Sequence, residues 1–150
     1  MFFVAREETE VRVEENDLIR KKRYLKRYKK NNALIDRLED KLVDLDARIY
    51  KIKSPNYSGM PRGGTPVTLE DLLSEKLETE ERINRLSVKG KKLRWETIEK
   101  IDESDNPRHA EILELFFVQC MSFDMIAEKT GYTERHVIRL YTEAINSLDF

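Results

Sequence analysis

The sequence predicts an all-α protein in which a long antiparallel helical hairpin of coiled-coil type precedes a C-terminal helix-turn-helix domain. Helix breakers are scarce, with 5 Gly and 4 Pro in 150 residues, and apolar residues recur every three or four positions along two long segments. A third, shorter segment carries the caps and turn of a compact helical domain. We therefore expect an N-terminal extension at residues 1–14, a hairpin arm at 15–101 with a loop at 54–67, and a helix-turn-helix domain at 108–150.

The N-terminal extension begins with the apolar run MFFVA, and charged residues follow at once. This run is too short for the apolar region of a signal peptide and far too short to span a membrane, so no membrane partner is expected. We predict a strand-like or frayed end whose Phe2 and Phe3 pack on a neighbouring segment.

The first helix of the arm is predicted over about residues 15–53. Asn31 and Asn32 interrupt its apolar stripe, and the positions between the apolar residues are mostly charged. Because a single helix cannot bury such a seam, this helix needs a partner, and a short connection to a second long helix favours an antiparallel hairpin. The seam consists of Ile35, Leu38, Leu42, Leu45, Ile49 and Ile52.

The second helix of the arm follows a loop at residues 54–66, which holds three of the four prolines and three of the five glycines. Thr68 is a candidate N-cap with Asp71 three residues later, close to a capping box. The helix runs to about Ile101, and Gly90 inside it costs about 1 kcal/mol relative to Ala, which indicates a kink or a close helix crossing. Its apolar positions are Leu69, Leu72, Leu73, Leu77, Ile83, Leu86, Leu93, Ile98 and Ile101.

The C-terminal domain begins after a break at residues 102–107. A scaffold helix over 109–120 is apolar nearly all round, so its neighbours must bury it. Ser122 is expected to cap the next helix, Gly131 to end it in the left-handed conformation, and Thr133 to cap the last helix. The inner stripe of the last helix is Val137, Leu140, Ala144, Ile145 and Leu148.

The outer face of that last helix suits nucleic acid. Two short helices joined by a tight turn form the layout in which a helix N-terminus enters the major groove of DNA. Arginine pairs bidentately with guanine and glutamate accepts a hydrogen bond from cytosine, so Arg135, Arg139 and Glu134 are candidate base contacts. The outer face also carries His136 and Glu143.

The segment FDMIAEKTGYTERHVIRLYTEAINSL resembles region 4 of the sigma-70 family, the helix-turn-helix that contacts promoter −35 elements. The resemblance places base contacts at Glu134, Arg135 and Arg139, and puts Thr133 and His136 near the DNA backbone. The matching residues are Phe123, Asp124, Ile126, Ala127, Gly131, Tyr132, Thr133, Val137, Ala144, Ile145 and Leu148.

The whole chain is similar in layout to small phage-encoded transcriptional regulators, the RinA-type and ArpU-type late-gene activators. The features that carry this resemblance are the charged helical hairpin, a Ser-Pro…Met-Pro-Arg-Gly loop and the C-terminal region 4-like domain. The resemblance implies a DNA-binding activator of phage genes.

The net charge of −1 hides an uneven distribution, because residues 108–150 hold 4 basic and 7 acidic residues while residues 20–30 hold eight basic residues and no acid. A second basic run occupies residues 89–94. In an antiparallel pair, positions whose numbers sum to about 121 face each other, which would place Lys30 opposite Lys91 and Arg27 opposite Arg94. Phosphate is a natural partner for clustered cations. The candidate backbone contacts are Arg23, Lys26, Arg27, Lys30, Lys91, Lys92 and Arg94.

One other interpretation of the basic runs and one of the C-terminal domain stay open. A charge run is usually a solvated helix face. The domain with the acidic excess could contact a protein instead of DNA, in which case the arm is an adaptor. Tyr24 and Tyr28, which interleave the first basic run, are expected to be packing residues and not nucleotide-stacking ones.

The sequence offers no catalytic or metal-binding pattern. Two separated His and one Cys lack metal-ligand spacing, and the carboxylates lie on charged helix faces, so we expect no enzyme activity and no cofactor. A single cysteine, Cys120, permits no internal disulfide and suits the reducing cytoplasm.

These patterns together predict a sequence-specific transcriptional regulator that binds double-stranded DNA in the cytoplasm. Continuation of the heptad seam past the hairpin would pair two chains and give a homodimer. The alternative is an interaction adaptor that binds RNA polymerase or a sigma factor without itself contacting bases.

Overall fold

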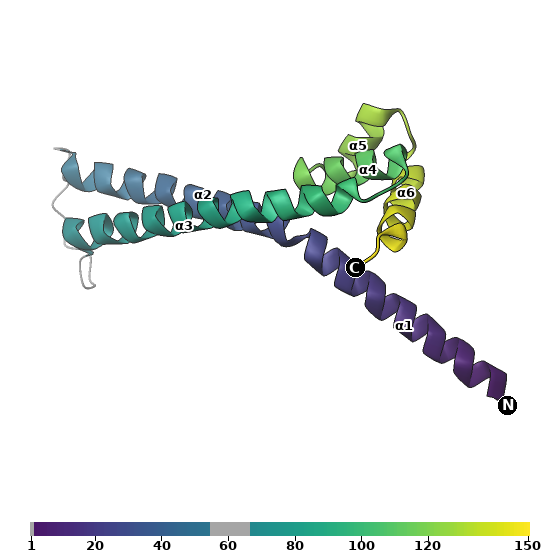
Figure 1. Ribbon diagram of the computed structural model, residues 1–150. Coiled ribbons are helices and arrows are strands. Elements are labelled where there is room, and N and C mark those ends of the chain that lie inside the picture. Colours follow the sequence, from purple (N-terminus) through teal and green to yellow (C-terminus); the bar gives the residue numbers. More distant parts are fainter. Residues whose placement is uncertain (1, 55–66) are drawn as a thin grey trace. The chain divides into compact units, whose positions relative to one another are not determined.

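A computed structural model describes the backbone of residues 2–54 and 67–150 and, within these ranges, the side chains from residue 10 onward. Every regular element of this part of the chain is a helix (Figure 1), which confirms the all-α class. Most of the loop expected at 54–67, with its Ser-Pro…Met-Pro-Arg-Gly motif, lies outside the described residues. The elements are α1 (Phe2–Leu25), α2 (Arg27–Lys53), α3 (Leu69–Asp102), α4 (Pro107–Leu113), a π-helical turn η1 (Glu114–Val118), α5 (Phe123–Thr130) and α6 (Glu134–Ser147).

Contacts divide the chain into two compact units. The arm unit is Asn31–Gly90, and the composite unit joins Met1–Lys30 to Lys91–Phe150. The helix break expected at 102–107 is present, since α3 ends at Asp102 and α4 begins at Pro107, but it lies inside the composite unit.

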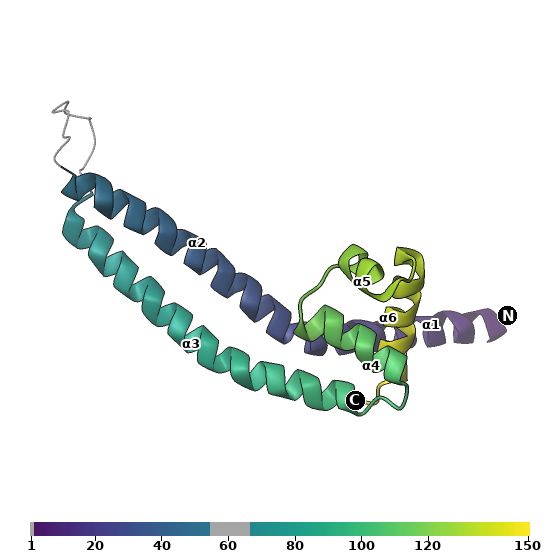
Figure 2. The same cartoon turned by 90° about the horizontal axis from the view of Figure 1, so that it is seen from above.

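In the arm unit, α2 and α3 run antiparallel and side by side (Figure 2). Two ion pairs link them, with Lys41 Nζ 2.9 Å from Glu75 Oε1 and Lys76 Nζ 2.7 Å from Asp46 Oδ1. The Lys76–Asp46 pair follows the register expected from the sequence, whereas Lys41 and Glu75 lie about one helical turn from it. A buried apolar cluster between the helices consists of Leu45, Ile49 and Leu72, with Leu69 packed against it, and Leu38 of α2 is buried as well.

A buried polar contact lies at the Gly90 end of the arm unit. Asn31 is only 6 % exposed, and its Nδ2 donates to the Leu86 carbonyl at 2.9 Å. A Cβ added to Gly90 would lie 2.8 Å from the same Nδ2. Gly90 therefore marks a close helix crossing, one of the two outcomes that the sequence indicated, and a buried Asn of this kind fixes helix register.

The start of α3 confirms the predicted cap. The Thr68 amide donates to Asp71 Oδ2 at 3.3 Å and the Asp71 amide donates to Thr68 Oγ1 at 3.2 Å, which is a reciprocal capping box. The apolar seam of α3 is narrower than expected. Leu73 and Leu77, two of the apolar positions named from the sequence, are 44 % and 58 % exposed. On α2, Ile52 was expected in the heptad seam but is 39 % exposed, so that assignment was wrong.

The N-terminal helices differ from the prediction in two ways. The backbone is helical from Phe2, so the strand-like start was wrong, while the packing of Phe2 and Phe3 lies outside the described side chains. The single helix expected over 15–53 is interrupted at Lys26, where α1 ends and α2 begins. Arg27 Nε donates to the Tyr24 carbonyl at 3.0 Å, and a side chain that bonds a helix carbonyl in this way is a recognised cause of helix breaks.

The core of the composite unit is built around η1. Leu115, Phe116, Phe117 and Val118 are four consecutive buried residues, as expected for a helix apolar all round, but the helix changes to π geometry to hold them. The centre of the Phe116 ring lies 4.8 Å from the ring centres of Phe117, Phe123 and Tyr141. The scaffold helix expected at 109–120 is thus α4 followed by η1, and Cys120 ends it with a φ of 57°.

Three caps were predicted at the ends of α5 and at the start of α6, and the structure has two of them. Gly131 ends α5 with a φ of 75°, and Thr133 Oγ1 accepts from the His136 amide at 3.2 Å. Ser122 occupies the N-cap position of α5, but its hydroxyl donates to the Asp124 carboxylate instead of capping the helix, so that detail is corrected. All five residues expected on the inner stripe of α6 are buried, and Tyr141 joins them.

Candidate nucleic-acid interface

The start and outer face of α6 bring together all three candidate base contacts and the two candidate backbone contacts of the C-terminal domain. A shallow depression there is lined by Thr133, Arg135, His136, Ile138, Arg139 and Thr142. Arg135 and Arg139 are exposed. Glu134 is also exposed in the first turn of α6, although it does not line the depression. A partner that approaches this face meets two guanidinium groups, a hydroxyl-capped helix start and a half-buried imidazole.

Local contacts hold the start of α6 in place. The Thr133 cap fixes the first turn, and the Tyr132 ring meets the His136 ring edge to face at 4.9 Å. Tyr132 packs against the core of the composite unit, so the position of His136 is tied to that core. The first turn of α6 is therefore ordered before any partner binds.

Arg139 lies near Glu143, with its Nε 3.6 Å from Glu143 Oε1. His109 Nε2 lies 3.8 Å from the other carboxylate oxygen of Glu143. The Arg139–Glu143 pair is solvent-exposed, and such i,i+4 pairs contribute only about 0.3–0.5 kcal/mol. Arg139 can leave this pair for another acceptor at little cost.

Two exposed apolar residues of α5 and α6 were not predicted from the sequence. Ile138 is 42 % exposed on α6 and Met125 is 51 % exposed on α5. A signal for Ile138 is present in the sequence, since it follows Val137 of the inner stripe by one residue and is therefore turned about 100° away on a helix.

Three lysines of the first basic run dock α1 and the first turn of α2 onto the C-terminal helices. Lys21 is buried, and its Nζ donates to the Asn146 carbonyl at 3.3 Å. Lys22 Nζ lies 5.6 Å from the centre of the Tyr141 ring and Lys29 Nζ lies 3.6 Å from the centre of the Phe116 ring. Ammonium groups over aromatic faces are attracted by the ring quadrupole. These three lysines therefore hold the composite unit together, a role that neither expected interpretation of the run included.

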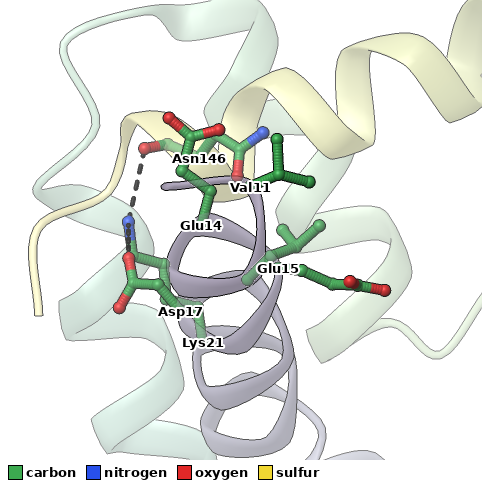
Figure 3. A pocket seen from close by; sticks show the side chains of 7 residues that line it. Val11, Glu14, Glu15, Asp17, Lys21 and Asn146 are labelled. Atoms are coloured by element: carbon green, nitrogen blue, oxygen red, sulfur yellow. Dashed lines mark hydrogen bonds and ion pairs between the residues drawn. The ribbon is translucent and has the colours of Figure 1, made fainter. Parts of the chain in front are cut away.

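An open hollow of about 700 Å³ flanks Lys21 (Figure 3). Glu14, Glu15 and Asp17 line it together with Val11, Leu18, Lys21 and Asn146. A hydrogen bond from Lys21, supported by Arg20, holds the pKa of the Asp17 carboxyl below its usual value. This hollow is rich in carboxylates, so it disfavours phosphate.

Arg27 is also engaged within the composite unit. Its guanidinium lies 3.9 Å from the centre of the Tyr24 ring, and its Nη2 is 2.8 Å from Glu96 Oε2. The ion-pair partner of Arg27 is thus Glu96, two positions after the Arg94 that the expected register placed opposite it. Tyr24 also meets the Phe150 ring edge to face at 5.2 Å, which confirms its packing role.

The remaining cations of the two basic runs are open to solvent. Arg23, Lys30, Lys91, Lys92 and Arg94 are exposed and Lys26 is half-buried. The Arg27–Glu96 ion pair links the first basic run to the turn of α3 that follows the second run, and Arg23, Lys30, Lys92 and Arg94 each lie within about one helical turn of it in sequence. Apart from the three docking lysines, the composite unit therefore carries several exposed cations that could contact phosphates.

Among the described residues, no group of three or more His, Cys, Asp or Glu side chains could hold a metal ion. In the same part of the chain, none of the helices combines the length and apolar character that crossing a bilayer needs. The chain matches no protein-family model, and neither curated proteins nor solved structures include a significant match.

Proposed function

We propose that the chain is a sequence-specific DNA-binding transcriptional regulator of the cytoplasm that inserts the outer face of α6 into the major groove. The main support is the division of α6 into a fully buried inner stripe and an outer face with two exposed arginines, Arg135 and Arg139. A helix capped by Thr133 presents amides and hydroxyls to phosphates while its side chains contact base edges.

Phosphate contacts in this proposal come from the open cations of the composite unit. Arg23, Lys26, Lys30, Lys91, Lys92 and Arg94 supply attraction that the acidic C-terminal domain lacks. We assign Arg27 to the structure and not to DNA, because Glu96 and Tyr24 already engage its guanidinium.

The resemblance to RinA-type and ArpU-type activators suggests activation of phage genes as the biological role. A homodimer would place two α6 helices on two half-sites. Exposed apolar side chains on the arm unit, namely Val43, Tyr50, Leu73 and Leu77, support a second chain there. A dimeric mass in light scattering is expected, and a monomeric mass at all concentrations would remove this part of the proposal.

A second candidate is an adaptor that binds RNA polymerase or a sigma factor without contacting bases. The acidic excess of residues 108–150 and the exposed Met125 favour a protein partner for this domain. Copurification with polymerase, together with no specific DNA complex, would select this candidate.

The test is selection of duplex sites from a random pool, followed by affinity measurements at several salt concentrations. Arg135→Ala and Arg139→Ala should each weaken specific binding by about 5- to 100-fold and relax preference for guanine. Replacing both Arg23 and Lys30 by Ala should lower the salt slope by about 0.9 for each phosphate that the protein no longer neutralises, without changing base preference.

Arg82→Ala is the matched control, since Arg82 is an exposed arginine of α3 in the arm unit. It should leave both affinity and base preference unchanged. Failure to select any site, or equal effects of Arg82→Ala and Arg135→Ala, would contradict the proposed use of α6.

A further inference from the structure

An exposed isoleucine shares the depression on the α6 outer face with the two arginines. Ile138 is 42 % exposed, whereas the preceding Val137 is completely buried. On a helix, residues three and four positions apart are neighbours, so Arg135 and Thr142 border Ile138, and Arg139 in turn borders Arg135. All four line the same depression.

Nothing within the helix requires isoleucine at this position. A β-branched side chain loses rotamer freedom in a helix and is a weaker helix former than Ala, Leu or Lys. Ile138 also lies outside the buried core of the composite unit. Its apolar surface is thus available to a partner.

Thr142 extends the apolar character of this strip. Its Oγ1 donates to the Ile138 carbonyl at 3.1 Å, so the hydroxyl proton is used inside the helix. The outer face of α6 therefore presents apolar surface at Ile138, flanked by guanidinium groups that favour guanine.

The apolar group that the major groove offers is the C5 methyl of thymine. We propose that Ile138 is a specificity-determining residue that packs on the C5 methyl of a thymine adjacent to a guanine contacted by Arg135 or Arg139. This inference rests on the proposed DNA-binding function and names the base step that the face would select.

The test replaces each thymine of the selected site, one at a time, by deoxyuridine. Deoxyuridine lacks only the C5 methyl and keeps every hydrogen-bonding group, so it isolates the apolar contact. Binding should weaken about fourfold at one thymine beside a guanine and stay unchanged at the others, as expected for the burial of one methyl group.

Ile138→Ser should bind the thymine and deoxyuridine duplexes equally well, while the helical content stays that of the wild type. Ile19→Ser is the matched control, because Ile19 is an exposed isoleucine of α1 at 47 % exposure, and it should keep the fourfold preference. Specific binding with no methyl effect, or a methyl effect that persists in Ile138→Ser, overturns this inference alone. If no duplex is bound specifically, the proposed function fails and the inference fails with it.

Discussion

The arm unit and the composite unit use different kinds of core. In the arm unit, a cluster of three buried aliphatic residues lies between two helices, Leu38 is buried apart from that cluster, and ion pairs at the surface link the helices. In the composite unit, the rings of Phe116, Phe117, Phe123 and Tyr141 contact one another, and lysines from α1 and α2 lie against two of them. Local periodicity builds the first core, whereas contacts between residues far apart in sequence build the second.

The difference bears on how each unit is stabilised. Exposed ion pairs contribute little, typically about 0–1 kcal/mol each, so the arm unit depends on a narrow apolar seam. Large aromatic side chains bury more area per residue and gain from edge-to-face contacts. The composite unit should therefore respond more strongly to removal of one core side chain.

The largest effect is expected from Phe117→Ala, which removes a completely buried ring. The free energy of unfolding should fall by about 3–5 kcal/mol, because the surrounding rings cannot collapse into the space. Leu45→Ala in the arm unit should cost about 2–3 kcal/mol, near the low end of the leucine range, because its small core borders water. Urea unfolding followed by circular dichroism measures both values.

The control for this pair is Leu77→Ala, since Leu77 is 58 % exposed in the arm unit. It should change the free energy of unfolding by less than about 0.5 kcal/mol. Equal losses of stability for Phe117→Ala and Leu45→Ala would contradict the distinction between the two cores.

The same distinction explains what the sequence could predict. The buried seam positions Leu38, Leu45 and Ile49 and the Thr68–Asp71 capping box depend on one helix period or on residues near in sequence, and both features are present. Gly90 could be noticed as a glycine inside a long helix, but the residue that it approaches, Asn31, lies far away in sequence. Leu73 and Leu77 satisfied the same period but lie outside the seam, since a two-helix contact buries only a narrow stripe.

Contacts between distant segments could not be predicted from periodicity. The Lys29–Phe116 contact joins residues far apart in the chain, and no local pattern distinguishes it from a solvated lysine. For the candidate site, the caps and the inner stripe of α6 determine which residues point outward, so the exposure of Glu134, Arg135 and Arg139 was predictable. Whether they contact DNA stays a prediction.

A smaller effect is expected from pH, through Tyr141 in the aromatic core. Burial raises the pKa of its phenol from 10.0 to about 12. The folded state therefore favours the neutral form, so this contribution to stability is intact below pH 10 and is lost as the pH rises from 10 to about 12. The decrease in stability should approach about 2 kcal/mol.

Unfolding measured from pH 8 to pH 12 should show a steeper decline for the wild type than for Tyr141→Phe, which keeps the ring and removes the proton. Tyr50→Phe serves as the control, because Tyr50 is an exposed tyrosine of the arm unit. Parallel pH profiles for the wild type and Tyr141→Phe would show that the phenol is not shielded by the aromatic core.

The smallest effect concerns the polar contact of the arm unit. Gly90→Ala gains about 1 kcal/mol of helix propensity. Its new Cβ, however, would lie 2.8 Å from Asn31 Nδ2 and would displace the side chain from the Leu86 carbonyl. Breaking that hydrogen bond costs about 1 kcal/mol, so the net change should be close to zero.

In the Asn31→Ala background the clash is absent, and Gly90→Ala should stabilise the arm unit by about 1 kcal/mol. The double-mutant cycle therefore isolates a coupling of about 1 kcal/mol between the two positions, measured by urea unfolding. Additive single effects would mean that Gly90 and Asn31 do not restrict each other. A measured coupling would show that even the arm unit, whose fold follows from helix periodicity, uses one pair of residues far apart in sequence to fix how its two helices cross.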